Sequence, residues 1–130
     1  MLEKRTTETC SAALVAVKDA LYVLGGKWKL PIIVSLQEGA CRFKELQRRV
    51  EDITPRVLSK ELKEMELNDL VTRRVISTTP VIVEYSLTAY SETLTPLTNA
   101  LHAWGSQHRQ RVFEKARQER EYKLLQSEPA

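Results

Sequence analysis

A connection of only three residues, 51–53, joins two short segments of helical periodicity. The first segment, "CRFKELQRRV", places Phe43, Leu46 and Val50 on one side of a helix. The second, "DITPRVLSKELKEME", repeats its apolar residues with the same period. Two helices joined by so short a link cross at a steep angle, which is the geometry of a helix-turn-helix. This link limits the possible folds of the chain more than any other segment does.

The second of these helices, predicted over residues 54–67, sorts its side chains by type. Thr54 is expected to cap it through the hydroxyl, and Pro55 suits the first helical position. The apolar stripe consists of Leu58, Leu62 and Met65. A second stripe, which we call the basic row, consists of Arg56, Ser59, Lys60 and Lys63. The three glutamates of the helix fall outside this row, although a charged stripe can also be an ordinary solvated face.

A change of periodicity follows this helix. "VTRRVIS" and "VIVEYSL" alternate β-branched and polar residues, and "TTP" lies between them, so residues 71–87 are predicted to form a β-hairpin. Val81, Val83, Tyr85 and Leu87 share the face expected to pack inward. A hairpin directly after the second helix makes the motif a winged helix. The predicted fold class is therefore mainly α, with a small β-hairpin wing.

This arrangement predicts DNA binding through the basic row. The glutamates lie off this row, as a DNA-binding face requires, because a carboxylate facing phosphate would oppose the counterion release that drives binding. Arg56 is assigned to base edges, since its planar fork can bond guanine at two atoms. Lys60 and Lys63 are assigned to phosphates. The further candidate DNA contacts are Thr54, Pro55, Ser59, Arg42, Lys44, Arg73, Arg74, Thr78 and Thr79. For Arg73, an ion pair with an acid such as Glu84 is the alternative.

The segments on either side of the motif indicate a second subunit. A helix over residues 11–24 is apolar on more than one face, and residues 94–108 repeat at the alternating spacing of a seam between helices. We therefore expect these two helices to form a dimer interface. Its candidate residues are Leu14, Val17, Leu21, Leu97, Leu101, Trp104 and His108. The expected organisation is a flexible arm over 1–9, a winged helix-turn-helix domain over 10–105 and a charged helical extension over 106–130.

Five motifs in order carry a resemblance to a known family. They are "GGKW", "RFKEL", "ITPRVLSKELKEME", "PVIVEYSLT" and "PLTNALHAWG", spread over roughly residues 10–105. Together they resemble the HxlR-type winged helix-turn-helix regulators of bacteria. The resemblance implies a cytoplasmic homodimer that binds a palindromic operator, with the first and last helices at the dimer interface. The chain departs from the family pattern at Asp52, Asp69 and Ser91, where glycine is frequent.

Cys10 raises a second hypothesis. It lies at the predicted start of the first helix, where the partial positive charge of a helix N-terminus favours a thiolate. A cysteine near this position is common in the family, and some members use it to sense oxidants or electrophiles. The proline that usually follows is Ser11 here. The alternative is a small, half-buried residue without chemistry, and for Cys41 plain packing is expected.

Other classes of function are disfavoured by composition. The net charge of +3 permits contact with a polyanion without requiring it. Two cysteines make neither a disulfide framework nor a zinc site, and His102 and His108 are spaced for different helix faces. No signal segment, membrane span or catalytic arrangement is recognisable, so we expect a cytoplasmic, non-enzymatic protein without a cofactor. The remaining alternative is a winged helix that contacts an acidic protein partner instead of DNA.

Overall fold

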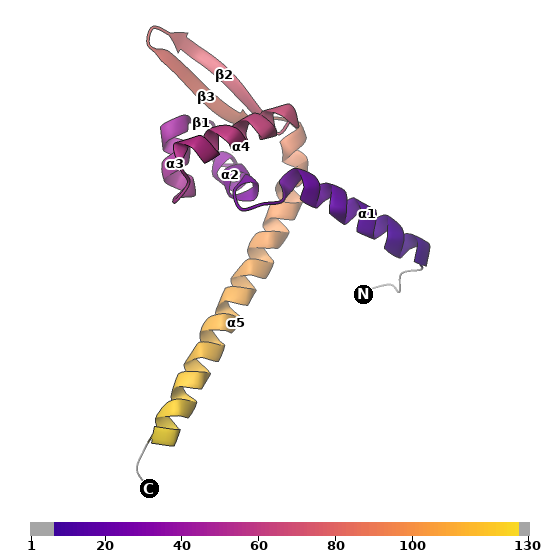
Figure 1. Cartoon of the computed structure of the whole chain (residues 1–130), viewed down its shortest axis with the longest axis vertical. Coiled ribbons are helices and arrows are strands. Elements are labelled where there is room, and N and C mark those ends of the chain that lie inside the picture. The colour runs from indigo at the N-terminus through magenta and orange to yellow at the C-terminus, as the bar shows by residue number, and fades with distance from the viewer. Residues whose placement is uncertain (1–6, 128–130) are drawn as a thin grey trace. The chain divides into compact units, whose positions relative to one another are not determined.

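The computed structural model describes residues 7–127, and these form helices and a small antiparallel sheet (Figure 1). The chain divides into two compact units, residues 1–93 and 94–130. The break lies at the beginning of the last helix, whereas we expected the extension to begin after Gly105. The elements are α1 (Thr7–Leu24), α2 (Lys29–Leu36), β1 (Cys41–Arg42), α3 (Phe43–Val50), α4 (Pro55–Leu67), β2 (Val71–Thr78), β3 (Val81–Leu87), the 3-10 helix η1 (Tyr90–Leu94) and α5 (Thr95–Ser127).

The predicted hairpin and its place after α4 are confirmed. β3 lies in the middle of a three-stranded antiparallel sheet, with β2 on one side and the short β1 on the other. The register between β2 and β3 shifts once, between Val75 and Ser77, where one extra residue bulges from the ladder. The mainly helical fold class with a β-hairpin wing is therefore correct.

The core of the first unit lies where α2, α3 and α4 meet the base of the sheet. Its buried apolar side chains are Leu24, Ile32, Ile33, Leu36, Cys41, Leu46, Ile53, Leu58, Leu62, Met65, Leu70 and Val71. Burial of each large apolar side chain stabilises the fold by about 1.5–3 kcal/mol. The inward stripe of α4, predicted from periodicity, is thus confirmed at all three positions. In α3, Leu46 is fully buried, while Phe43 and Val50 are half-buried.

The prediction that Val81 faces the core is wrong. Its side chain is 68% exposed, although Val83, Tyr85 and Leu87 further along β3 are partly covered. Val81 pairs with Thr78 at the tip of the hairpin, which extends away from the helices of the first unit (Figure 1). Alternation predicts the face of a strand correctly, but it does not show how far the covering layer reaches.

The residues at each end of α1 account for where the helix begins and where it ends. The helix begins at Thr7 and not at Ser11 as predicted, and Glu8 in its first turn complements the positive end of the helix. Residues 1–6 of the expected arm lie outside the described residues. The helix ends at Leu24, as the two glycines after it predicted. A Cβ on Gly25 would lie 2.2 Å from the Leu21 carbonyl oxygen, and Gly26 has a φ of +96°.

The second unit consists largely of α5, one continuous helix of 33 residues. Gly105 does not interrupt it, and the expected seam and the charged extension belong to the same helix. Arg117 lies 3.9 Å from Glu114 and 4.0 Å from Glu121, at the spacings that stabilise an exposed helix.

Within residues 7–127, no single helix is long and apolar enough to cross a bilayer. Taken together, the helical stretches Glu8–Leu24 and Lys29–Leu36 have the length and apolar composition of a span, but they are bent by 74° relative to each other. In this structure Ile32, Ile33 and Leu36 of that pair are instead part of the core.

Candidate nucleic-acid interface

The turn between α3 and α4 is short and contains two residues with a positive φ. Glu51 has φ 59° and ψ 150°, and Asp52 has φ 55°, conformations that cost about 1–3 kcal/mol for a residue with a side chain. Ile53 then turns inward and is 4% exposed. The Gln47 side-chain amide donates to the Ile53 carbonyl at 3.4 Å, which closes the turn onto α3. The angle between the two helices is therefore held by both the core and a hydrogen bond.

Both ends of α4 are as predicted. The Thr54 hydroxyl accepts a hydrogen bond from the Val57 N–H at 3.2 Å, and Pro55 occupies the first helical position. The helix stops at Leu67, where the Asn68 side chain donates to the Glu64 carbonyl at 2.9 Å and Asp69 takes a φ of 59°. These caps satisfy backbone groups that the helix ends would otherwise leave without a partner.

The basic row lies on the surface. Arg56, Ser59, Lys60 and Lys63 are all exposed, while the apolar stripe on the opposite side of α4 is buried. Within residues 7–127 no ion pair joins Arg56, Lys60 or Lys63 to a carboxylate. All three cations are thus available to an external anion.

Two acids of α4 are held by a cation from another helix. The Lys29 ammonium at the start of α2 donates to Glu61 Oε2 and to Glu64 Oε2, at 2.7 Å in each case. Burial acts to lower the pKa of Lys29, but the bonds to the two glutamates outweigh it, so the pKa is raised above 10.5. The hydrogen bond from Lys29 lowers the pKa of Glu64 below its usual 4.5. Sequence periodicity placed these acids off the basic row but gave no sign of this partner.

The two arginines of β2 lie on opposite faces of the sheet. Arg73 stands opposite Tyr85, and with Ser59, Leu62, Lys63, Glu66 and Tyr85 it lines a depression beside α4. Arg74 stands opposite Glu84, which faces Arg42 of β1 on its other side. The alternative that paired Arg73 with Glu84 is therefore wrong. Arg73 is the wing arginine on the side of the basic row.

A second depression lies along α3 and the turn. It is lined by Lys44, Gln47, Arg48, Glu51, Asp52 and Ile53. Lys44 and Arg48 are both exposed and one helical turn apart. Arg48 was missed at the sequence level, although its spacing from Lys44 was visible there. The remaining candidates Arg42, Thr78 and Thr79 are exposed as well, the last two at the tip of the hairpin.

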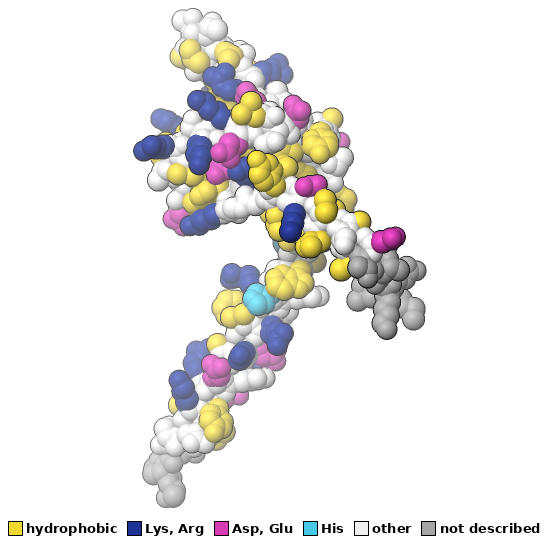
Figure 2. Space-filling model, turned by 45° about the vertical axis from the view of Figure 1, so that its right-hand side comes forward, with side chains coloured by type: hydrophobic (Ala, Val, Ile, Leu, Met, Phe, Trp, Pro, Cys, Tyr) yellow, Lys and Arg dark blue, Asp and Glu magenta, His cyan; other side chains and the backbone are white. Residues whose placement is uncertain are grey.

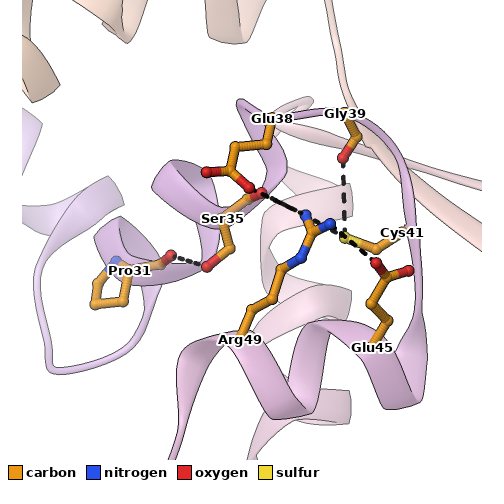
Figure 3. A network of polar contacts seen from close by, with 7 residues as sticks. All are labelled: Pro31, Ser35, Glu38, Gly39, Cys41, Glu45 and Arg49. Carbon is orange, nitrogen blue, oxygen red and sulfur yellow. Dashed lines mark hydrogen bonds and ion pairs between the residues drawn. The ribbon is translucent and has the colours of Figure 1, made fainter.

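Arg49 is a basic residue that the fold itself uses (Figure 3). Its guanidinium bonds Glu45 at 2.9 Å and the Ser35 carbonyl at 3.2 Å, and lies 3.5 Å from the Cys41 sulfur and 3.9 Å from Glu38. Burial raises the pKa of the Cys41 thiol, which is only 1% exposed. The expectation that Cys41 is a packing residue is thus confirmed, and Arg49 ties α3 to α2.

The flanking helices carry uncovered apolar side chains. On α1, Leu14, Val17 and Leu21 are more than half exposed, and Cys10 in the first turn is exposed as well. On α5, Leu97, Leu101 and Trp104 are exposed, and the rings of Trp104 and His108 stack at 5.0 Å. Figure 2 shows hydrophobic side chains at the surface of both helices. In the described part of the chain, no cluster of three or more His, Cys, Asp or Glu side chains could hold a metal ion.

Comparison with known proteins places this arrangement in a family. The family model described as HxlR-like helix-turn-helix matches residues 23–113. The chain belongs to the HxlR-like family. An uncharacterised HTH-type transcriptional regulator of Methanothermobacter thermautotrophicus is 38% identical over 106 residues, which cover 79% of this chain and 81% of the relative.

Solved structures agree with the assignment to the HxlR-like family. The redox regulator HypR in its reduced form superposes with a TM-score of 0.71 and 36% identity, over 76% of this chain and 98% of that one. The reduced form of the transcriptional regulator YodB of B. subtilis superposes with a TM-score of 0.60 and 33% identity, over 80% of this chain and 94% of that one. The protein is thus a helix-turn-helix transcriptional regulator, and its relatives carry the names of regulators and not of enzymes.

Proposed function

We propose that the protein binds a palindromic DNA operator as a homodimer and inserts α4 into the major groove. The observation that carries this proposal is the basic row on a helix whose neighbouring acids are bound to Lys29. DNA binding and dimerisation are typical of HxlR-like regulators, and the row supplies a surface that fits phosphate.

Each candidate contact has a separate role in this proposal. Arg56 lies in the first turn of α4, and the N-terminal part of a recognition helix reaches base edges, so Arg56 reads a guanine. Lys60 and Lys63 bind phosphates, while Thr54, Pro55 and Ser59 lie against the groove wall. Contacts to the DNA backbone are proposed from β1, α3 and the wing, through Arg42, Lys44, Arg73, Arg74, Thr78 and Thr79.

The proposed dimer is formed through α1 and α5. Leu14, Val17, Leu21, Leu97, Leu101, Trp104 and His108 are its proposed contacts, and a second copy would cover side chains that a single chain leaves in water. A twofold axis then presents two copies of α4 to successive major grooves, about 34 Å apart on the duplex.

Substitution of Arg56 and of Lys60 tests the assigned roles. Arg56→Ala is expected to weaken operator binding by about 1–3 kcal/mol and to relax the sequence preference at one base pair. Lys60→Ala is expected to weaken binding to all sequences alike and to reduce the salt dependence, because it removes a phosphate contact. Titration of selected genomic fragments against both variants, at several salt concentrations, measures these effects.

Lys115→Gln removes an exposed lysine of α5 that is outside the proposed DNA and dimer contacts, so it is the control and should bind like the parent. Both alanine variants binding like the parent would remove the assignment. If the parent fails to bind sheared genomic DNA even at low salt, the protein-contact alternative is favoured instead.

We further propose that Cys10 makes the regulator responsive to oxidants. The thiol is exposed in the first turn of α1, on a helix assigned to the dimer interface. HypR, a structural relative, is described as a redox regulator and has been solved in reduced and oxidised forms. A modification at Cys10 would act on subunit contact and so on the spacing of the two α4 helices.

Mild treatment with diamide, which oxidises thiols, is expected to change the DNA affinity of the parent and to leave Cys10→Ser unaffected. Cys41→Ala is the control, since the buried Cys41 thiol should take no part and this variant should respond like the parent. Equal responses of the parent and Cys10→Ser would end this proposal.

A further inference from the structure

Lys29 joins two helices through an unusual pair of bonds. One ammonium on α2 holds two carboxylates of α4 that are three residues apart, Glu61 and Glu64. The side chains of Lys29 and Glu61 are 12% and 14% exposed, whereas that of Glu64 is 41% exposed. Glu64 therefore lies at the edge of the contact, with solvent on its other side.

Glu64 also has a second cation within reach along its own helix. Lys60 precedes it by four residues, the spacing at which side chains on a helix face each other. Lys60 lowers the pKa of Glu64 through its charge, but only after the larger effects of the Lys29 hydrogen bond and charge and the opposing effect of burial. Two lysines thus compete for one carboxylate, and Lys29 holds it in this structure.

We propose that Lys29 is a positioning residue for DNA binding, which keeps Glu64 from pairing with Lys60 and so leaves Lys60 free for phosphate. The inference rests on the proposed function, because it gives Lys60 a phosphate to bind. Glu61 does not take part in the competition, since its side chain is largely covered and neighbouring positions on a helix do not face each other.

The expected size follows from counterion release. Each phosphate contact contributes about 0.9 to the slope of log affinity against log salt, so losing one contact per subunit lowers the slope of a dimer by about 2. If parent and variant bind equally at 1 M salt, this corresponds at 0.1 M salt to a loss of affinity of roughly sixtyfold. Lys29→Met removes the charge while keeping much of the side-chain length and should show this loss on a mixed-sequence DNA duplex.

The decisive comparison adds a second substitution. Lys29→Met combined with Glu64→Gln should restore the salt slope of the parent, because no carboxylate is left to capture Lys60. Lys29→Met combined with Glu61→Gln is the matched control and should stay as weak as Lys29→Met alone. A purely structural role for Lys29 predicts that neither combination restores the slope. In a Lys60→Ala background, Lys29→Met should leave the slope unchanged.

A further variant keeps the test decisive if Lys29→Met does not fold, which thermal unfolding would reveal. Glu64→Gln alone should leave the slope as in the parent, because Lys29 already holds this carboxylate. A steeper slope in Glu64→Gln would show that Glu64 reduces the Lys60 contact despite Lys29, and would overturn the inference. If the parent itself does not bind the duplex, the proposed function fails. If the parent binds and Lys29→Met keeps its slope, only this inference fails.

Discussion

Replacing Trp104 with glutamate is expected to turn the proposed dimer into monomers and to weaken operator binding by roughly a hundredfold or more. Trp104 is 65% exposed on α5, and its ring stacks on His108, so a second copy could cover both rings. Large aromatic side chains contribute a large share of the binding free energy of an interface, and a buried carboxylate without a partner opposes it. Sedimentation measures the mass, and DNA titration measures the affinity.

Leu125→Glu supplies the matched control for this prediction. Leu125 lies on the same helix, is 70% exposed and falls outside the residues assigned to the interface. The Leu125→Glu protein should remain a dimer and bind DNA like the parent. A Trp104→Glu protein that sediments as a dimer would contradict the assignment of α5 to the interface.

Leu58→Ala is expected to lower the free energy of unfolding by about 3 kcal/mol, within the range of 2–5 kcal/mol for such changes. Leu58 has no exposed surface and faces the core as the first residue of the apolar stripe of α4. Its truncation removes buried methyl groups and leaves a cavity that a small core closes only in part. Urea denaturation measures the change, and an unchanged slope with denaturant would confirm that stability alone is affected.

Ser59→Ala, one position further along the helix and exposed, is the control for Leu58→Ala. Its free energy of unfolding should stay within about 0.5 kcal/mol of that of the parent. If Leu58→Ala were equally mild, α4 would not be fixed to the core through this stripe.

α4 was predicted well from the sequence because the residues that set its start, its buried face and its end lie close together in the chain. Thr54 and Pro55 start the helix, Leu58, Leu62 and Met65 repeat with the helical period, and Asn68 and Asp69 end it. The hairpin was recognisable for the same reason, since alternating residues and a short turn are adjacent in the chain. The fold class and the exposure of the basic row follow from these short-range signals.

Contacts between distant segments were not predictable in this way. Lys29 lies 32 residues before Glu61, and nothing in the periodicity of either helix indicates that they meet. The register that sets Glu84 against Arg74 instead of Arg73 depends on the strand pairing. The burial of Val81 was predicted wrongly, because tertiary packing decides how far a hairpin extends beyond the helices that cover it.

The unbroken course of α5 has a mechanical consequence. The stretch after Gly105 extends the helix by about 30 Å, at a rise of 1.5 Å per residue. A tilt of only about 5° near Trp104 would move the far end of a stiff rod of this length by roughly 3 Å. The end of α5 therefore moves further than its base does, and a probe attached there would report a small rearrangement near Trp104 and His108 as a larger displacement.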